Sequence, residues 1–274
     1  MKIKAHKLIH NDGSQVPFIR SPNQGRGTIT PRFLVMHYTA GASAESSVNW
    51  LTNRDANASA HLVIGRDGSI VQLVDFNRKA WHAGKSHWRG ISGLNSHSIG
   101  IELDNPGLLQ GAPGNWRTTW GRLVPDSEVL VEKRESDNAT LGWHTYTEQQ
   151  LEVAREVSLA LVRHYNLDEI IGHEDIAPNR KRDPGTAFPM LSFQHLIEGR
   201  DSDDGEDIFK TTVALNIRKG PGTEFDKYTD VSPLPQGTRL SVLKKHGVWR
   251  KVDVIDVINN EMDIVGWVHS RYIA

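Results

Sequence analysis

A run of nine residues without an apolar side chain divides this chain into two unequal parts. Residues 199–207 are glycine, serine, arginine and acidic residues only, and such a segment buries too little surface to fold. We therefore predict a solvated acidic linker at 199–207. It separates a larger domain, residues 1–198, from a smaller one, residues 208–274, and each must form a core of its own.

Composition narrows the classes of partner. The chain is 38% hydrophobic and 24% charged, as in ordinary globular proteins. Its formal net charge of -1 gives no global attraction to nucleic acid or to an anionic membrane, so neither is expected as a partner. No segment approaches the roughly 20 apolar residues of a membrane helix, so membrane insertion is not expected either. The absence of cysteine excludes disulfides, thiolate metal ligands and cysteine nucleophiles.

The larger part mixes predicted strands and helices, which indicates an α/β domain. The predicted strands are residues 32–37, 60–64, 69–74 and 98–103, and the predicted helices are 43–51, 147–165 and 189–198. Residues 32–37 form a continuous apolar run that ends in histidine, as in a strand buried on both faces. Thr147 and Gln150 have the spacing of a capping box. Residues 105–142 show neither the two-residue alternation of a strand nor the 3.6-residue period of a helix, so no element is assigned to them.

Three side chains are candidate ligands of one metal ion. His37 ends the buried strand, His173 follows an apolar pair, and Asp183 precedes Pro-Gly in a loop. Taken singly, each has an ordinary interpretation: a core histidine, a loop histidine and a turn aspartate. Together they offer two imidazoles and a carboxylate, a set that leaves a fourth position open on a catalytic zinc ion.

Five short strings, in order along the chain, resemble the zinc-dependent N-acetylmuramoyl-L-alanine amidases and the related peptidoglycan recognition proteins. The strings are Met36-His-Tyr-Thr39, Ala80-Trp-His-Ala-Gly84, Ser98-Ile-Gly-Ile-Glu102, Gly172-His-Glu-Asp-Ile-Ala-Pro178 and Lys181-Arg-Asp-Pro-Gly185. The resemblance spans roughly residues 30 to 198. It implies a mixed central β-sheet flanked by helices.

The resemblance also implies roles for individual residues. One zinc ion would be bound by His37, His173 and Asp183, and the catalytic groups that are not ligands would be Glu102 and Lys181. The strand pattern agrees for Glu102, which points away from the face of Ile101. Trp81 and His82 are expected to line the substrate groove.

The implied reaction is hydrolysis of the amide between N-acetylmuramic acid and the L-alanine of the peptidoglycan stem peptide. The partner would then be peptidoglycan or a soluble muropeptide. A recognition protein that only binds peptidoglycan is the main alternative, and another N-acylated amide as substrate is a second one. The basic first ten residues lack the apolar run of a signal peptide. We therefore expect synthesis in the cytoplasm, with action at the cell wall after release or export by another route.

The smaller part is predicted to be all-β. Residues 213–222 suggest a strand followed by a Gly-Pro-Gly turn, and further short strands follow up to residue 273. The strings Leu215-Asn-Ile-Arg-Lys-Gly-Pro-Gly222 and Val265-Gly-Trp-Val268 resemble bacterial SH3-like domains. This resemblance implies a small barrel that binds the cell wall and raises the concentration of enzyme on it.

Overall fold

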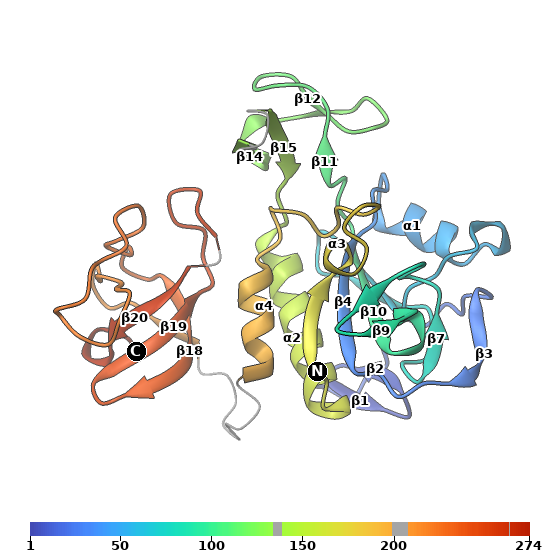
Figure 1. Cartoon of the computed structure of the whole chain (residues 1–274), viewed down its shortest axis with the longest axis horizontal. Coiled ribbons are helices and arrows are strands. Elements are labelled where there is room, and N and C mark those ends of the chain that lie inside the picture. Colours follow the sequence, from blue (N-terminus) through green and yellow to red (C-terminus); the bar gives the residue numbers. More distant parts are fainter. Residues whose placement is uncertain (134–138, 199–207, 263) are drawn as a thin grey trace. The chain divides into compact units, whose positions relative to one another are not determined.

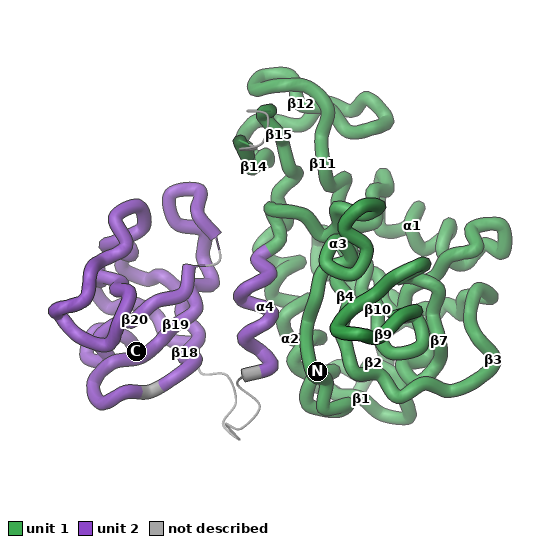
Figure 2. Tube along the Cα trace, in the orientation of Figure 1, with its two compact units in different colours: residues 1–188 green, residues 189–274 purple. Residues whose placement is uncertain are grey.

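A computed structural model of the chain describes residues 1–133, 139–198, 208–262 and 264–274. The chain divides into two units, residues 1–188 and 189–274, each with its own core (Figure 1, Figure 2). The predicted linker at 199–207 lies outside the described residues.

A five-stranded mixed sheet forms the centre of the first unit, in the order β16-β4-β10-β5-β6. The first four strands are parallel, and β6 pairs with β5 as an antiparallel edge. The strands are β16 (Glu169–Gly172), β4 (Phe33–Tyr38), β10 (Ser98–Leu103), β5 (Leu62–Ile64) and β6 (Ile70–Gln72). The α/β class with a mixed central sheet is therefore confirmed, and the predicted strands match these elements.

Alternate residues of β4 face opposite sides of the sheet. Val35 and His37 pair with Gly100 and Glu102 of β10, so these residues share one face, while Met36 points to the other. The first five residues of β4 are buried, because both faces of a parallel sheet are covered. His37 and Glu102 thus lie on one face of the sheet.

The described part of the first unit includes the α-helices α1 (Ala44–Leu51), α2 (Glu148–Tyr165) and the single turn α3 (His173–Ile176). Helix α2 lies alongside the sheet and buries Ala154, Val157 and Leu161. The Thr147 hydroxyl caps α2 by accepting from the Gln150 N–H at 3.2 Å, as predicted. The reciprocal half of the predicted capping box is not formed. The Gln150 amide instead donates to the carbonyl of Ile64, at 3.0 Å, and to a second sheet carbonyl.

The segment that sequence periodicity left unassigned forms small antiparallel sheets above the central one (Figure 1). Its strands are β11 (Leu108–Leu109), β12 (Trp116–Arg117), β13 (Leu123–Val124), β14 (Val129–Lys133) and β15 (Thr140–His144). Trp116 is buried at its centre, packed against Leu109 and Val124. Two-residue strands are too short to carry a period, which is why no pattern indicated them. The remaining strands of the unit are β1 (Lys2–Lys4), β2 (Lys7–Ile9), β3 (Gln24–Thr28), β7 (Arg78–Ala80), β8 (His87–Trp88) and β9 (Ile91–Ser92).

The second unit begins earlier than predicted. The sequence placed residues 189–198 in the first domain, but the helix they form, α4 (Met190–Glu198), groups with residues 208–274 (Figure 2). The buried Ser192 hydroxyl donates to the fully buried Asp253 carboxylate at 2.8 Å, which ties α4 to the sheet of this unit. The boundary is therefore corrected to residue 188.

The second unit contains one four-stranded antiparallel sheet in the order β17-β18-β19-β20. The strands are β17 (Ile208–Lys210), β18 (Arg239–His246), β19 (Trp249–Val254) and β20 (Val265–His269). Apolar residues from these strands and from the preceding turns, among them Ile217, Leu234 and Val252, form its core. The predicted all-β character of residues 208–274 agrees with this sheet.

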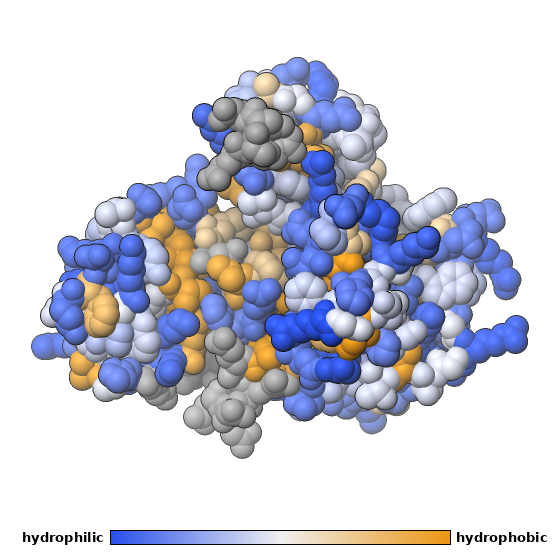
Figure 3. Space-filling model, viewed as in Figure 1, coloured by the Kyte–Doolittle hydropathy of each residue, from blue (hydrophilic) through white to orange (hydrophobic). Residues whose placement is uncertain are grey.

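The outer surface of the first unit is mostly hydrophilic on the face drawn in Figure 3. Within the described residues, no helix combines the length and the apolar character needed to cross a bilayer.

Candidate metal centre and active site

Sheet register brings three predicted site residues to one edge. His37 pairs with Glu102, its parallel neighbour on β10. On the other side of β4, Gly172 pairs with Met36, so His173, the next residue, starts α3 beside His37. All three lie at the carboxyl ends of parallel strands, where α/β sheets commonly bind ligands.

Asp183 reaches the same place from the loop that follows α3. Its carbonyl accepts the Glu174 N–H at 2.9 Å, which folds the loop back onto the start of the helix. The Tyr146 hydroxyl donates to the Pro184 carbonyl at 2.8 Å and holds the loop from the other side. The Asp183 carboxylate is thereby fixed beside both histidines.

Three potential ligand atoms converge there. His37 Nδ1, His173 Nδ1 and Asp183 Oδ2 are each 2.9 Å from the other two. A tetrahedral ion with bonds of roughly 2.0–2.2 Å holds its ligand atoms roughly 3.3 Å apart, so the observed triangle needs little expansion to bind one. All three residues are buried. These side chains therefore form a candidate metal centre, as predicted.

Hydrogen bonds within the protein satisfy this triangle poorly. Two imidazole Nδ1 atoms face each other, and a neutral imidazole carries a single proton to share between its two nitrogens. A cation accepts lone pairs from all three atoms at once. Two imidazoles and a carboxylate are also the donor set of zinc sites that retain an open position.

The electrostatic surroundings favour the ligand forms of these side chains. Burial lowers the pKa of His37 to about 4, and the hydrogen bond with Asp183 only partly opposes this. Burial acts to raise the pKa of Asp183, but hydrogen bonds from His173 and His37 outweigh it and hold that pKa well below its usual range. A neutral imidazole and an ionised carboxylate are what a metal ion requires.

Glu102 lies beside this triangle without being part of it. Burial, reinforced by the charge of Asp183, raises its pKa well above the ordinary value, while the charge of Lys181 lowers it. Its Oε2 is buried, and no group in the described part of the chain donates a hydrogen bond to it. A half-buried carboxylate of this kind has the properties of a proton acceptor. The positive charge of Lys181 lowers the pKa of both Glu102 and His37.

A hollow of about 330 Å³ opens next to Glu102. The loop after β4 and the exposed face of α1 form its walls, including Thr39, Ser46 and Trp50. The Trp50 ring is 55% exposed there. The hollow connects Glu102 with solvent and is the candidate place for a substrate. The sequence analysis singled out neither Ser46 nor Trp50, because polar and aromatic residues of a surface helix carry no signal of their own.

The two residues predicted to line the substrate groove, Trp81 and His82, have different surroundings in the structure. Trp81 is half-buried, and its backbone N–H donates to the Ser59 hydroxyl at 2.9 Å. His82 is buried beneath the metal centre, where its Nδ1 lies 3.0 Å from His37 Nε2. The structure therefore places His82 behind a candidate metal ligand. Groove lining remains a prediction for Trp81.

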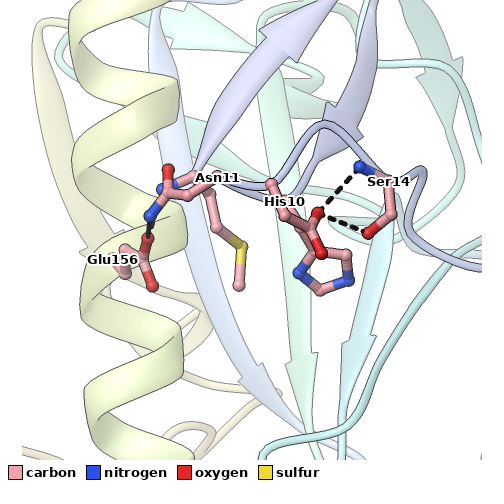
Figure 4. Close-up of a pocket in the computed structure, with 6 residues that line it drawn as sticks. His10, Asn11, Ser14 and Glu156 are labelled. Carbon is pink, nitrogen blue, oxygen red and sulfur yellow. Dashed lines mark hydrogen bonds and ion pairs between the residues drawn. The ribbon is translucent and has the colours of Figure 1, made fainter.

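A larger surface hollow, about 450 Å³, lies between the N-terminal segment and α2 (Figure 4). It is lined by Met1, His10, Asn11, Asp12, Ser14 and Glu156. These groups satisfy one another: Ser14 donates to Asp12, and Asn11 and the terminal ammonium both bind the Glu156 carboxylate. It contains none of the predicted site residues.

Comparison with known proteins identifies the family. The sequence model of the N-acetylmuramoyl-L-alanine amidases matches residues 27–186, more than half of the chain, and this range includes every residue of the candidate site. The chain belongs to this family. The resemblance found in the sequence is thereby confirmed for the first unit.

Individual proteins that are similar to this chain carry amidase names as well. The chain is 35% identical over 141 residues to the 1,6-anhydro-N-acetylmuramyl-L-alanine amidase AmpD of Escherichia coli (strain K12), covering 51% of this chain and 58% of the relative. It is 31% identical over 191 residues to the N-acetylmuramoyl-L-alanine amidase AmiD of the same organism, covering 66% of this chain and 58% of AmiD. The chain thus spans less than two thirds of either relative. A solved complex of E. coli AmiD with an anhydro-muramyl peptide matches 69% of this chain and 65% of that chain, at 27% identity and a TM-score of 0.47.

We predict that the full chain binds one equivalent of a divalent metal ion and that Asp183→Ala abolishes this binding. The substitution removes one of three ligand atoms and the only negative charge among them. Elemental analysis by mass spectrometry after dialysis gives the stoichiometry, and a higher melting temperature on adding metal checks it by mass action. Asp168→Ala is the control, because that exposed carboxylate pairs with Arg32 instead. Equal metal content in the two variants would contradict the assignment.

Proposed function

We propose that this chain is a zinc-dependent N-acetylmuramoyl-L-alanine amidase, which hydrolyses the amide between N-acetylmuramic acid and the L-alanine of the stem peptide. The observation that carries the proposal is the triangle of His37, His173 and Asp183 with the Glu102 carboxylate next to it on the same face of the sheet. Family membership and the printed activities of AmpD and AmiD support the choice of bond.

Amide hydrolysis requires an activated water, stabilisation of the carbonyl oxygen and a proton for the leaving amine. Zinc, when bound, supplies Lewis acidity that lowers the pKa of a water molecule and polarises a carbonyl group. Glu102 accepts the proton of the attacking water, and its raised pKa then suits it to deliver that proton to the leaving nitrogen. Lys181 offsets the negative charge that develops on the carbonyl oxygen.

The experiment that tests the activity is digestion of purified peptidoglycan and of soluble muropeptides. Zinc-loaded protein, metal-stripped protein and Asp183→Ala are compared, and products are read by mass spectrometry. We expect free stem peptides with an N-terminal L-alanine from the zinc-loaded protein alone. Binding to peptidoglycan without any product would instead favour the alternative, a non-catalytic recognition protein. Including both 1,6-anhydro and reducing muropeptides shows whether the preference in the name of AmpD applies to this chain.

Two substitutions separate catalysis from metal binding. Glu102→Gln removes the proton acceptor and Lys181→Met removes the cation, yet neither residue is among the three converging ligands. Each should lower the turnover rate by about 10²- to 10⁴-fold while the zinc content stays at one equivalent. Glu45→Gln and Lys4→Met, which change exposed groups of the same types, serve as controls. Full turnover by Glu102→Gln would exclude that residue from the mechanism.

For the second unit we propose an SH3-like domain that holds the enzyme on the cell wall. The antiparallel sheet β17-β18-β19-β20 with its own core supports a separate module. On it, Trp249 and His269 lie with ring centroids 5.4 Å apart, and Tyr272 follows at 5.6 Å from His269, 39% exposed. Such a row of aromatic rings offers a stacking surface to a sugar or a peptide.

Removing the second unit tests this role. A chain that ends at residue 188 should pellet less with purified sacculi than the full chain, because the second attachment is lost. Its hydrolysis of soluble muropeptides should change by less than about twofold, since all the proposed catalytic residues remain. Circular dichroism first establishes that the shortened chain is folded. Equal pelleting of the two folded chains would reject a wall-binding role.

A further inference from the structure

The two imidazole ligands are held by one short segment, His82-Ala83. Each ligand presents Nδ1 to the metal centre and leaves Nε2 for a second partner. His37 Nε2 lies 3.0 Å from His82 Nδ1, and His173 Nε2 lies 3.2 Å from the Ala83 carbonyl oxygen. Two adjacent residues therefore support ligands that come from different elements, β4 and α3.

That segment is fixed in turn by one side chain. Asn95 Oδ1 accepts the backbone N–H of His82 at 3.0 Å and that of Ala83 at 2.7 Å. Arg180 adds a bond to the Ala83 carbonyl at 2.9 Å. Its guanidinium lies 3.4 Å from His173 Nε2, but both groups donate, so the shared carbonyl is their common acceptor. Among the described residues, Asn95 is the one side chain that binds both residues of the segment through a single oxygen.

The hydrogen bonds around His82 can all be formed with donors pointing one way, from His37 through His82 and Ser98 to the Leu94 carbonyl. With His37 Nδ1 turned toward the metal centre, its proton is on Nε2, which donates to His82 Nδ1. The proton of His82 is then on its Nε2, 3.2 Å from the Ser98 hydroxyl oxygen. Ser98 in turn donates to the Leu94 carbonyl at 2.6 Å. Every donor in this chain has an acceptor, and the chain ends on backbone.

Space for the His82 ring depends on a glycine in β10. A Cβ atom at Gly100 would lie 2.5 Å from both Cγ and Nδ1 of His82, closer than such atoms approach. Gly100 stands two residues before Glu102, on the same face of the sheet. Its lack of a side chain lets the ring of His82 pack directly beneath the metal centre.

We propose that His82 and Asn95 are positioning residues of the metal centre: together they fix the ring orientation and tautomer of both imidazole ligands. The inference rests on the metal site of the proposed function, and it is independent of which amide is hydrolysed. Groups of this kind that bond to ligand histidines typically change metal affinity by roughly 10- to 100-fold when lost.

Matched substitutions test the proposal through zinc affinity, measured on the full chain by competition with a chelator. His82→Leu removes the acceptor for His37, whereas His82→Asn retains an acceptor oxygen, Oδ1, at a reach similar to that of His82 Nδ1. We expect roughly 10- to 100-fold weaker zinc binding in the leucine variant and recovery of most of that loss in the asparagine variant. Asn95→Leu and Asn95→Asp form the same kind of pair. Gly100→Ala should weaken zinc binding without removing any polar group.

His144 provides the control for disturbing a buried histidine. It is 6% exposed, close to the 8% of His82, but its Nδ1 lies 3.0 Å from the Arg66 guanidinium and its Nε2 lies 3.2 Å from the Glu128 carboxylate. Neither partner belongs to the proposed metal centre. His144→Leu should therefore leave the zinc dissociation constant within about twofold of wild type, even if it lowers the melting temperature.

A second readout does not depend on any variant. Long-range nitrogen–proton NMR correlations of the zinc-loaded protein should show His82 with its proton on Nε2 and Nδ1 as an acceptor. The opposite tautomer of His82 would overturn the proposal, as would unchanged zinc affinity in both His82→Leu and Asn95→Leu. If the wild-type chain binds no zinc, the metal centre fails and the positioning role fails with it. If zinc binds but no amide is cleaved, only the proposed reaction fails.

Discussion

The approach of His37, His173 and Asp183 to within 2.9 Å of one another is the constraint on which the first unit depends. Burying three polar atoms without full hydrogen bonding opposes folding. The cost is tolerable where a cation binds all three, because binding energy then adds directly to folding energy. The parallel register of β16, β4 and β10 and the loop that carries Asp183 must form together for this to happen.

Glu102 differs from the neighbouring histidines in its hydrogen bonding. The Nε2 atoms of the two proposed ligand histidines have protein partners, whereas Glu102 Oε2 is buried and receives no hydrogen bond from the described residues. Donors around this carboxylate would stabilise its charged form and make it a weaker base. In the proposed mechanism, protein partners thus fix the outer nitrogens of the two histidines, while the carboxylate that would exchange a proton has no donor among the described residues. The stability lost at Glu102 would then be the counterpart of its proposed reactivity.

Sequence alone predicted the centre of this arrangement well and its surroundings poorly. The apolar run ending at His37 and the strict alternation through Glu102 predicted two sheet strands, because burial imposes those patterns directly. The set of His37, His173 and Asp183 was predicted from the chemistry of these side chains, whereas the role proposed for Lys181 came from family resemblance, since loop residues have no period. The burial of His82 had no local signal, because it depends on Gly100, a residue of β10.

The division between fixed and variable parts of the site follows from the same geometry. The two proposed histidine ligands stand at or directly after strand ends and are supported from beneath by residues 82–83, so their positions are set by the sheet and its core. The hollow beside Glu102 is walled instead by the loop after β4 and by α1, with Trp50 on the exposed face of that helix. Changes in those surface residues alter what fits the hollow without moving a ligand. The choice among amide substrates is therefore expected to be determined there, while the hydrolytic chemistry is determined by the sheet.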